Sequence, residues 1–273
     1  MRTSNPALND ETFKNATFDF PVDRASNVMT LEGTAAKGLL LTGIVMVTGG
    51  ASFYWAMAQM IAAGPTMVDV EGRIGSLSNI PGPVMGMILS GAIIGAILAL
   101  VTIFWKQAAM FTSPLYAVAE GVFLGSFSTI FEYMYPGAVP VAVAITFGIL
   151  FSLLAIYMTG LIKPSENFKL GIAAATGGIM LFYVASMVSR MFFGYEFPFL
   201  HETGWMGIGF SLFVVVIASL NLVLDFDFIE NGVEAQAPKY MEWYAAFGLL
   251  VTLVWLYLEV LKLVVKIMAA RRN

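Results

Sequence analysis

The sequence predicts an all-α integral membrane protein that crosses the bilayer seven times. The 273 residues are 59% hydrophobic and 12% charged, with a mean hydropathy of +0.81, whereas a soluble domain has about 25% charged residues. The apolar residues come in long blocks, and a helix of about 20 such residues spans a hydrocarbon core of ~30 Å. These blocks lack the polar alternation that a membrane β-barrel needs.

Seven blocks are long enough, and we expect each of them to form one helix. They are roughly residues 38–61, 84–105, 115–134, 138–162, 170–193, 205–224 and 244–268. Residues that end helices, such as Pro81, Pro136 and Gly137, lie between the blocks. Trp105 and Trp205 stand at predicted helix ends, as residues of the membrane interface do.

Residues 1–36 are polar and are expected to form a flexible N-terminal arm. They lack the short apolar run and the small-residue cleavage site of a signal peptide. An amphipathic surface helix over residues 13–20 is the alternative. Eight of the 14 basic residues fall on the N-terminal side of the predicted topology and six on the opposite side, which favours a cytoplasmic N-terminus.

Small residues spaced four apart give the second and third predicted helices smooth faces. The pairs are Gly86 and Ser90, Gly91 and Gly95, and Gly121 and Gly125. Such spacing lets helix backbones approach closely in lipid. We interpret the pattern as tight packing within the molecule rather than as a dimer interface.

The sequence offers little support for an enzyme. The only histidine is His201, in a predicted loop, and there are no cysteines and no phosphate-loop motif. Asp225 and Asp227 share one predicted helix without a Gly-Asp dipeptide, which argues against an intramembrane aspartyl protease. The basic residues are scattered and form no basic patch of the kind that binds nucleic acid. We therefore expect no catalysis, no cofactor and no nucleic-acid partner.

Acidic residues inside the apolar blocks are the candidate site. An ionised carboxylate in hydrocarbon costs several kcal/mol, so such residues usually line a water-filled path or bind an ion. Asp225 closes the sixth block, and Glu259 lies inside the seventh. Asn221 lies one turn before Asp225 on the same face and extends the polar stripe. Asp227 is turned by about 200° from Asp225, so a solvated helix end is the first interpretation of Asp227 and Glu230. An accessory role at the site is the alternative for Asp227.

Two explanations remain open for Glu259. It can pair with Lys262 at i, i+3, or it can face the interior and share a proton or a cation with Asp225. Two carboxylates in contact titrate as a unit, and oxygen ligands suit Ca²⁺. Ca²⁺ close to both is therefore a hypothesis, although no firm metal site follows. Glu120, in the third helix, either makes a structural hydrogen bond to a neighbouring helix or lines a pore.

Four segments together resemble a known family. They are Ser4-Asn5-Pro6-Ala7-Leu8, Glu120-Gly121 followed by Leu124-Gly125, Asp225-Phe226-Asp227-Phe228-Ile229, and Leu256-Tyr257-Leu258-Glu259. The chain is similar to the Bax inhibitor-1/YccA family, which belongs to the transmembrane Bax inhibitor motif superfamily, and specifically to its longer bacterial branch. The combination covers essentially the whole membrane region.

The resemblance implies a seven-helix bundle of the Bax inhibitor-1 type in the bacterial inner membrane. It also implies a pH-sensitive leak for Ca²⁺ as permeant ion, gated by protonation of an acidic pair from helices six and seven. By motif, that pair would be Asp225 and Glu259. Glu259 stands where the family motif has Asp, and the second helix lacks a basic residue that some relatives carry there.

Helix counting gives a different partner for Asp225. A turn near residues 231–240 puts Asp225 and Glu259 at heights that differ by roughly 20 Å. On this count Glu242 lies at the same height as Asp225. A pair of Asp225 with Glu259 requires the seventh helix to start near Phe247.

A second functional class remains open besides a leak. The chain can be a non-conducting regulatory protein of the membrane, whose arm binds a quality-control protease or another membrane protein. In either case its main partner is the lipid bilayer.

Overall fold

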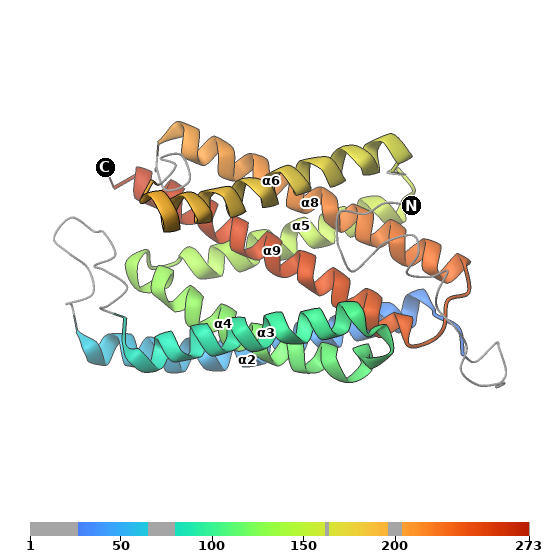
Figure 1. Ribbon diagram of the computed structural model, residues 1–273, viewed down its shortest axis with the longest axis horizontal. Coiled ribbons are helices and arrows are strands. Elements are labelled where there is room, and N and C mark those ends of the chain that lie inside the picture. The colour runs from blue at the N-terminus through green and yellow to red at the C-terminus, as the bar shows by residue number, and fades with distance from the viewer. Residues whose placement is uncertain (1–26, 65–79, 162–163, 196–203, 273) are drawn as a thin grey trace. The chain divides into compact units, whose positions relative to one another are not determined.

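A computed structural model describes residues 27–64, 80–161, 164–195 and 204–272 (Figure 1). In these residues the chain forms seven helices that are long and apolar enough to cross a membrane. They are α2 (Leu31–Ala63), α3 (Gly82–Phe104), α4 (Ala109–Met134), α5 (Ala138–Met158), α6 (Glu166–Phe193), α8 (Trp205–Glu234) and α9 (Met241–Ala270), and the short 3-10 helix η4 (Lys106–Ala108) precedes α4. The predicted all-α, seven-helix fold is confirmed.

Several helices are longer than their apolar blocks. Helix α2 begins at Leu31, so residues 31–36 are helical rather than part of the arm; residues 1–26, including the alternative helix over 13–20, lie outside the described residues. Helix α8 continues to Glu234, past the predicted end at residue 224. A hydropathy window ends a helix at its first charges, whereas here those charges have partners that keep the backbone helical.

Local chemistry explains the helix ends that bracket α5 and α6. The carboxylate of Glu132 accepts hydrogen bonds from the backbone N–H groups of Gly137 (2.6 Å) and Val139 (2.8 Å) at the start of α5. Ser165 caps α6 by accepting from the N–H of Phe168 at 3.3 Å. Gly194 ends α6 with a left-handed φ of 64°.

The chain divides into two compact units. Unit 1 consists of Met1–Leu31, Pro140–Lys239 and Gly248–Asn273, and unit 2 consists of Glu32–Val139 and Tyr240–Phe247. Helix α9 therefore contributes its first turns to unit 2 and its remainder to unit 1.

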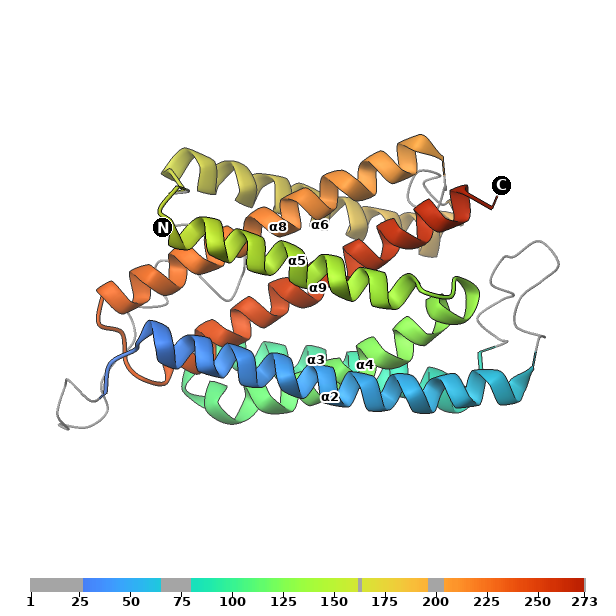
Figure 2. The same ribbon diagram turned by 180° about the vertical axis from the view of Figure 1, so that it is seen from behind.

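Backbone contacts at glycine hold unit 2 together. Helices α2, α3 and α4 lie side by side in both views (Figures 1 and 2). A Cβ atom on Gly91 of α3 would lie 2.8 Å from the backbone N of Phe123 in α4, and one on Gly121 would lie 3.0 Å from the N of Gly49 in α2. The predicted close packing is confirmed at these two glycines. At Gly86 the space is open, so that glycine takes no part in it.

Side-chain packing holds unit 1 together. Helix α6 packs against α8 through an apolar cluster formed by Ile172, Ile179, Val214, Ile217 and Leu224. The residues before α2 join this unit, because the N–H of Met29 donates to Ala237 O at 2.7 Å and the N–H of Lys239 donates to Asn27 O at 2.9 Å.

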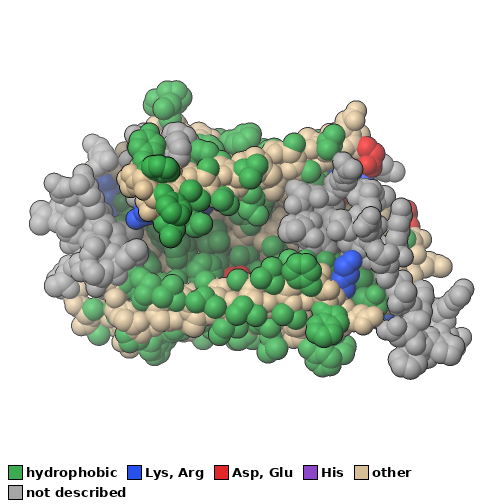
Figure 3. All heavy atoms as spheres, in the orientation of Figure 1, with side chains coloured by type: hydrophobic (Ala, Val, Ile, Leu, Met, Phe, Trp, Pro, Cys, Tyr) green, Lys and Arg blue, Asp and Glu red, His purple; other side chains and the backbone are tan. Residues whose placement is uncertain are grey.

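Burial separates the helices into two groups. In α4, α8 and α9, 56% of the residues in the most apolar stretch of 18 residues are buried. In the other four spans the share is 11–17%. Large apolar side chains cover much of the visible surface, and charged ones are sparse (Figure 3). Such exposed apolar helices fit contact with lipid. The candidate acids Glu120, Asp225 and Glu259 all lie on the three more buried helices.

Candidate ion-handling site

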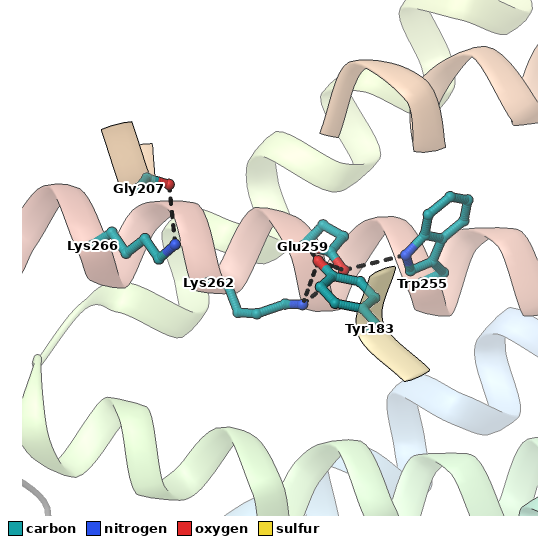
Figure 4. Close-up of polar contacts among 6 residues, drawn as sticks. All are labelled: Tyr183, Gly207, Trp255, Glu259, Lys262 and Lys266. Carbon is teal, nitrogen blue, oxygen red and sulfur yellow. Dashed lines mark hydrogen bonds and ion pairs between the residues drawn. The ribbon is translucent and has the colours of Figure 1, made fainter. Parts of the chain in front are cut away.

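Glu259 lies in a polar network that joins α6 to α9 in unit 1 (Figure 4). The residue is 2% exposed. Its Oε1 accepts from Lys262 Nζ at 2.7 Å and from Trp255 Nε1 at 3.2 Å. The hydroxyl of Tyr183, on α6, lies 3.2 Å from both carboxylate oxygens. The i, i+3 pair of Glu259 with Lys262 is therefore present, as one of the two explanations predicted.

Asp225 and Asn221 form a second buried polar site, on α8. Asp225 is 1% exposed, and Asn221 is buried one turn before it. The Asn221 amide donates to Thr176 Oγ1 of α6 at 2.9 Å and to Ile217 O at 2.8 Å. The predicted polar stripe is therefore buried in unit 1, and its Asn221 end faces α6.

The structure does not bring Asp225 and Glu259 into hydrogen-bond contact within the residues that it describes. The hydrogen bonds of Glu259 come from Tyr183, Trp255 and Lys262. Helices α8 and α9 run antiparallel past the contact of Lys266 Nζ with Gly207 O at 3.0 Å. Counting from that contact, Asp225 lies 18 residues along α8 and Glu259 seven residues back along α9, a height difference of roughly 16 Å. A shared ion-sensing role for these two acids stays a prediction.

Asp227 is part of an ion-pair cluster rather than a solvated helix end. Lys169, near the start of α6, is buried and places its ammonium 2.7 Å from Asp227 and 3.2 Å from Glu166. Asn231 adds a hydrogen bond to Asp227 Oδ2 at 3.0 Å. Glu230 is exposed and accepts from the hydroxyl of Tyr157. These partners explain why α8 continues beyond its apolar block.

Glu242 belongs to unit 2, where it forms a buried ion pair with Lys37 of α2. Glu242 is 0% exposed. Gly33, one turn before Lys37, leaves the room that the carboxylate fills. The Lys37 ammonium also lies 5.5 Å from the centroid of the Trp243 ring. Since Glu242 and Asp225 fall in different units, their equal height stays a prediction.

Glu120 lies on α4, also in unit 2. Tyr116 lies one turn earlier on the same helix and is buried. A Cβ atom on Gly95 of α3 would lie 3.3 Å from Glu120 Oε1, so glycine makes room for the carboxylate. A structural hydrogen bond from Glu120 to a neighbouring helix stays a prediction. A pore-lining role stays a prediction.

Sequence reasoning missed Tyr183, Lys169 and Lys37. Each of them meets its carboxylate from another helix, so no spacing in the sequence indicates the contact. Trp255, at i−4 from Glu259, could have been found from helical spacing alone. Among the described residues, no group of three or more His, Cys, Asp or Glu side chains has a geometry that could hold a metal ion.

The membrane-length helices and the buried carboxylates define the class: a multi-pass α-helical membrane protein with ionisable groups inside its spans. A sequence profile of the family described as Bax inhibitor 1 like matches residues 5–269. The chain belongs to this family, which confirms the resemblance of its motifs. Searches of curated proteins and of solved structures found no match.

Proposed function

We propose that the protein is a pH-sensitive cation leak of the bacterial inner membrane, with Ca²⁺ as permeant ion, that acts by conduction rather than by catalysis. The observation that carries the proposal is the burial of Asp225 (1% exposed) and Glu259 (2% exposed) in two membrane-length helices of one unit. Intramembrane carboxylates usually mark ion or proton pathways because burying them without such a role is costly. Family membership supports the same class of membrane protein.

In this mechanism Glu259 changes partners when a cation or a proton arrives. Its ionised form accepts charge-assisted hydrogen bonds from Tyr183, Trp255 and Lys262. The Lys262 side chain is 42% exposed, so its ammonium has room to move away from Glu259 when a cation takes its place. A proton on Glu259 removes the charge that binds the cation and halves the strength of the hydrogen bond from Tyr183.

Asp225 acts as a second cation-binding site, at a different height in unit 1. Asn221 and Thr176 supply amide and hydroxyl oxygens one turn away, and oxygen ligands suit a hard cation. The acidic pair is then two sequential sites rather than one carboxylate dyad. Protons compete with cations at both, so we expect the leak to fall as the pH falls.

Ion flux tests this proposal. Proteoliposomes loaded with a Ca²⁺ dye are compared for wild type, Asp225→Asn and Glu259→Gln across the pH range. We expect lower flux and a flatter pH profile in both variants. Glu230→Gln is the matched control, because Glu230 is an exposed carboxylate on the same helix as Asp225.

Two results would contradict parts of the proposal. Wild-type pH dependence in both variants would exclude the carboxylate mechanism. Absence of flux in the wild type at every pH would favour the non-conducting regulatory protein, and deletion of residues 2–26 would then test whether the arm binds a membrane partner.

We also propose a cytoplasmic N-terminus, from the excess of basic residues on that side. The chain has no cysteine, so single cysteines can be labelled without background. Arg272→Cys should react with an impermeant maleimide on intact cells after removal of the outer barrier, and Lys239→Cys only after the inner membrane is opened. The reverse pattern would contradict this orientation.

A further inference from the structure

One end of unit 1 carries a concentration of positive charge. Helix α6 ends there, α8 begins there, and α9 ends there, as the contact of Lys266 with Gly207 O shows (Figures 1 and 4). The described residues 180–195, 204–215 and 258–272 contain one carboxylate, Glu259. They contain five cations, which we call the basic end: Arg190, Lys262, Lys266, Arg271 and Arg272.

The other end of the same helices has the opposite charge. Its described carboxylates are Glu166, Asp225, Asp227, Glu230 and Glu234. Its described cations are Lys169 and Lys239. Blue side chains are visible where α6 ends, and red ones are visible at the opposite end of that helix (Figure 3). Among the described residues, positive charge is therefore concentrated at this one end of unit 1.

The cations of the basic end converge from two helices. Lys262 and Lys266 are one turn apart on α9, and the Lys262 ammonium lies 4.9 Å from the ring centroid of Tyr183 on α6. Arg190 is seven residues after Tyr183 and so lies on the same face of α6, toward α9. Lys262 and Lys266, one turn apart on the same helix, carry like charges that repel, so an anion placed among the cations would be stabilised.

The basic end also lies where lipid headgroups are expected. It is the terminus of three membrane-length helices. Exposed aromatic side chains surround it, namely Phe192, Phe193, Tyr195 and Trp205, and aromatic residues of this kind mark the membrane interface. At that depth the available anions are lipid phosphates.

We propose that the basic end binds the headgroup of an anionic phospholipid. The phosphate accepts charge-assisted hydrogen bonds from the guanidinium and ammonium groups, and the acyl chains lie along the exposed apolar faces of α6 and α8. Basic sites between membrane helices recognise lipid headgroups in this way. The proposal does not require conduction: of the five cations, only Lys262 also takes part in the Glu259 network.

Lipid titration tests the site. The full-length protein in a neutral detergent is titrated with phosphatidylglycerol or with phosphatidylcholine of the same acyl chains, and native mass spectrometry gives the affinity of each. We expect tighter binding of phosphatidylglycerol. Arg271→Gln/Arg272→Gln should weaken it roughly 25-fold, at about fivefold for each cation removed near the membrane surface, and leave phosphatidylcholine unchanged.

The matched control is Lys106→Gln/Lys239→Gln, which removes two cations outside the basic end and should keep the selectivity. Both variants are first checked for wild-type helicity and melting by circular dichroism. Equal affinity for the two lipids, or an equal loss in the control, would overturn the proposal. Competition by free glycerol phosphate at the same concentration would also overturn it, because the site would then bind a soluble anion.

Discussion

The two units bury glutamates of the same helix in different ways. In unit 2, Glu242 is fully enclosed and pairs with Lys37 from another helix, beside a glycine that leaves it just enough room. In unit 1, Glu259 pairs with Lys262 one turn away, and its link to another helix is the neutral hydroxyl of Tyr183. A full charge pair between helices can hardly be broken, whereas a local pair and a hydroxyl can be exchanged. The Lys37–Glu242 pair therefore suits a structural role, and the network around Glu259 fits the proposed exchange of partners.

The largest expected effect is loss of the Lys37–Glu242 pair. Glu242→Gln or Lys37→Met alone leaves a buried charge without its counter-charge, and we expect a loss of about 3–5 kcal/mol in the free energy of unfolding. Denaturation of the purified protein in detergent would measure it. The double variant Lys37→Met/Glu242→Met should lose less than either single variant, and an additive loss would contradict a buried pair.

The second effect tests the backbone contacts of unit 2. Gly91→Ala forces a Cβ atom against backbone atoms of α4, because the nearest would lie 2.8 Å away. We expect a destabilisation of about 1–3 kcal/mol, measured in the same denaturation. Gly86→Ala, on the same helix but with open space, should be neutral or slightly stabilising. Equal effects at both positions would show that α3 and α4 do not pack this closely.

A smaller effect is expected from the hydroxyl that joins α6 to α9. Tyr183→Phe removes one hydrogen bond to a carboxylate that keeps two other donors, so we expect a loss of about 0.5–1.5 kcal/mol. It should also shift the pH profile of Ca²⁺ flux. Tyr157→Phe, whose hydroxyl donates to the exposed Glu230, should leave that profile unchanged. A wild-type profile in Tyr183→Phe would remove this tyrosine from the mechanism.

The smallest effect on stability is expected from Lys262→Met. The Lys262 side chain is 42% exposed, and without it the buried Glu259 still accepts hydrogen bonds from Tyr183 and Trp255. We therefore expect a loss close to the value of a helical ion pair, about 0.3–0.5 kcal/mol. Flux should rise instead, because the permeant cation no longer competes with the ammonium for Glu259. A loss of stability similar to that of Lys37→Met would contradict the contrast between the two units.

The sequence predicted the helices well and their ends less well. Apolar length alone identified all seven spans, because backbone N–H and C=O groups in lipid must be hydrogen-bonded within the segment, and a long apolar segment achieves this as a helix. The sequence placed the end of α8 at residue 224, ten residues early. Hydropathy counts Asp227 as a charge, whereas in the fold Lys169 of another helix neutralises it. The sequence placed the start of α9 at residue 244 instead of Met241. Hydropathy counts Glu242 as a charge, although Lys37 neutralises it in the fold.

The sequence by itself determined the membrane class, indicated close packing at glycines of α3 and α4, and offered the local pair of Glu259 with Lys262 as one of two explanations. These depend on composition or on spacing within one helix, which the covalent chain sets. Only the tertiary structure decided that Lys37 pairs with Glu242, that Tyr183 meets Glu259, and that Glu259 takes its hydrogen bonds from partners other than Asp225. Those contacts depend on how helices far apart in the sequence are rotated and staggered against one another, and packing fixes both.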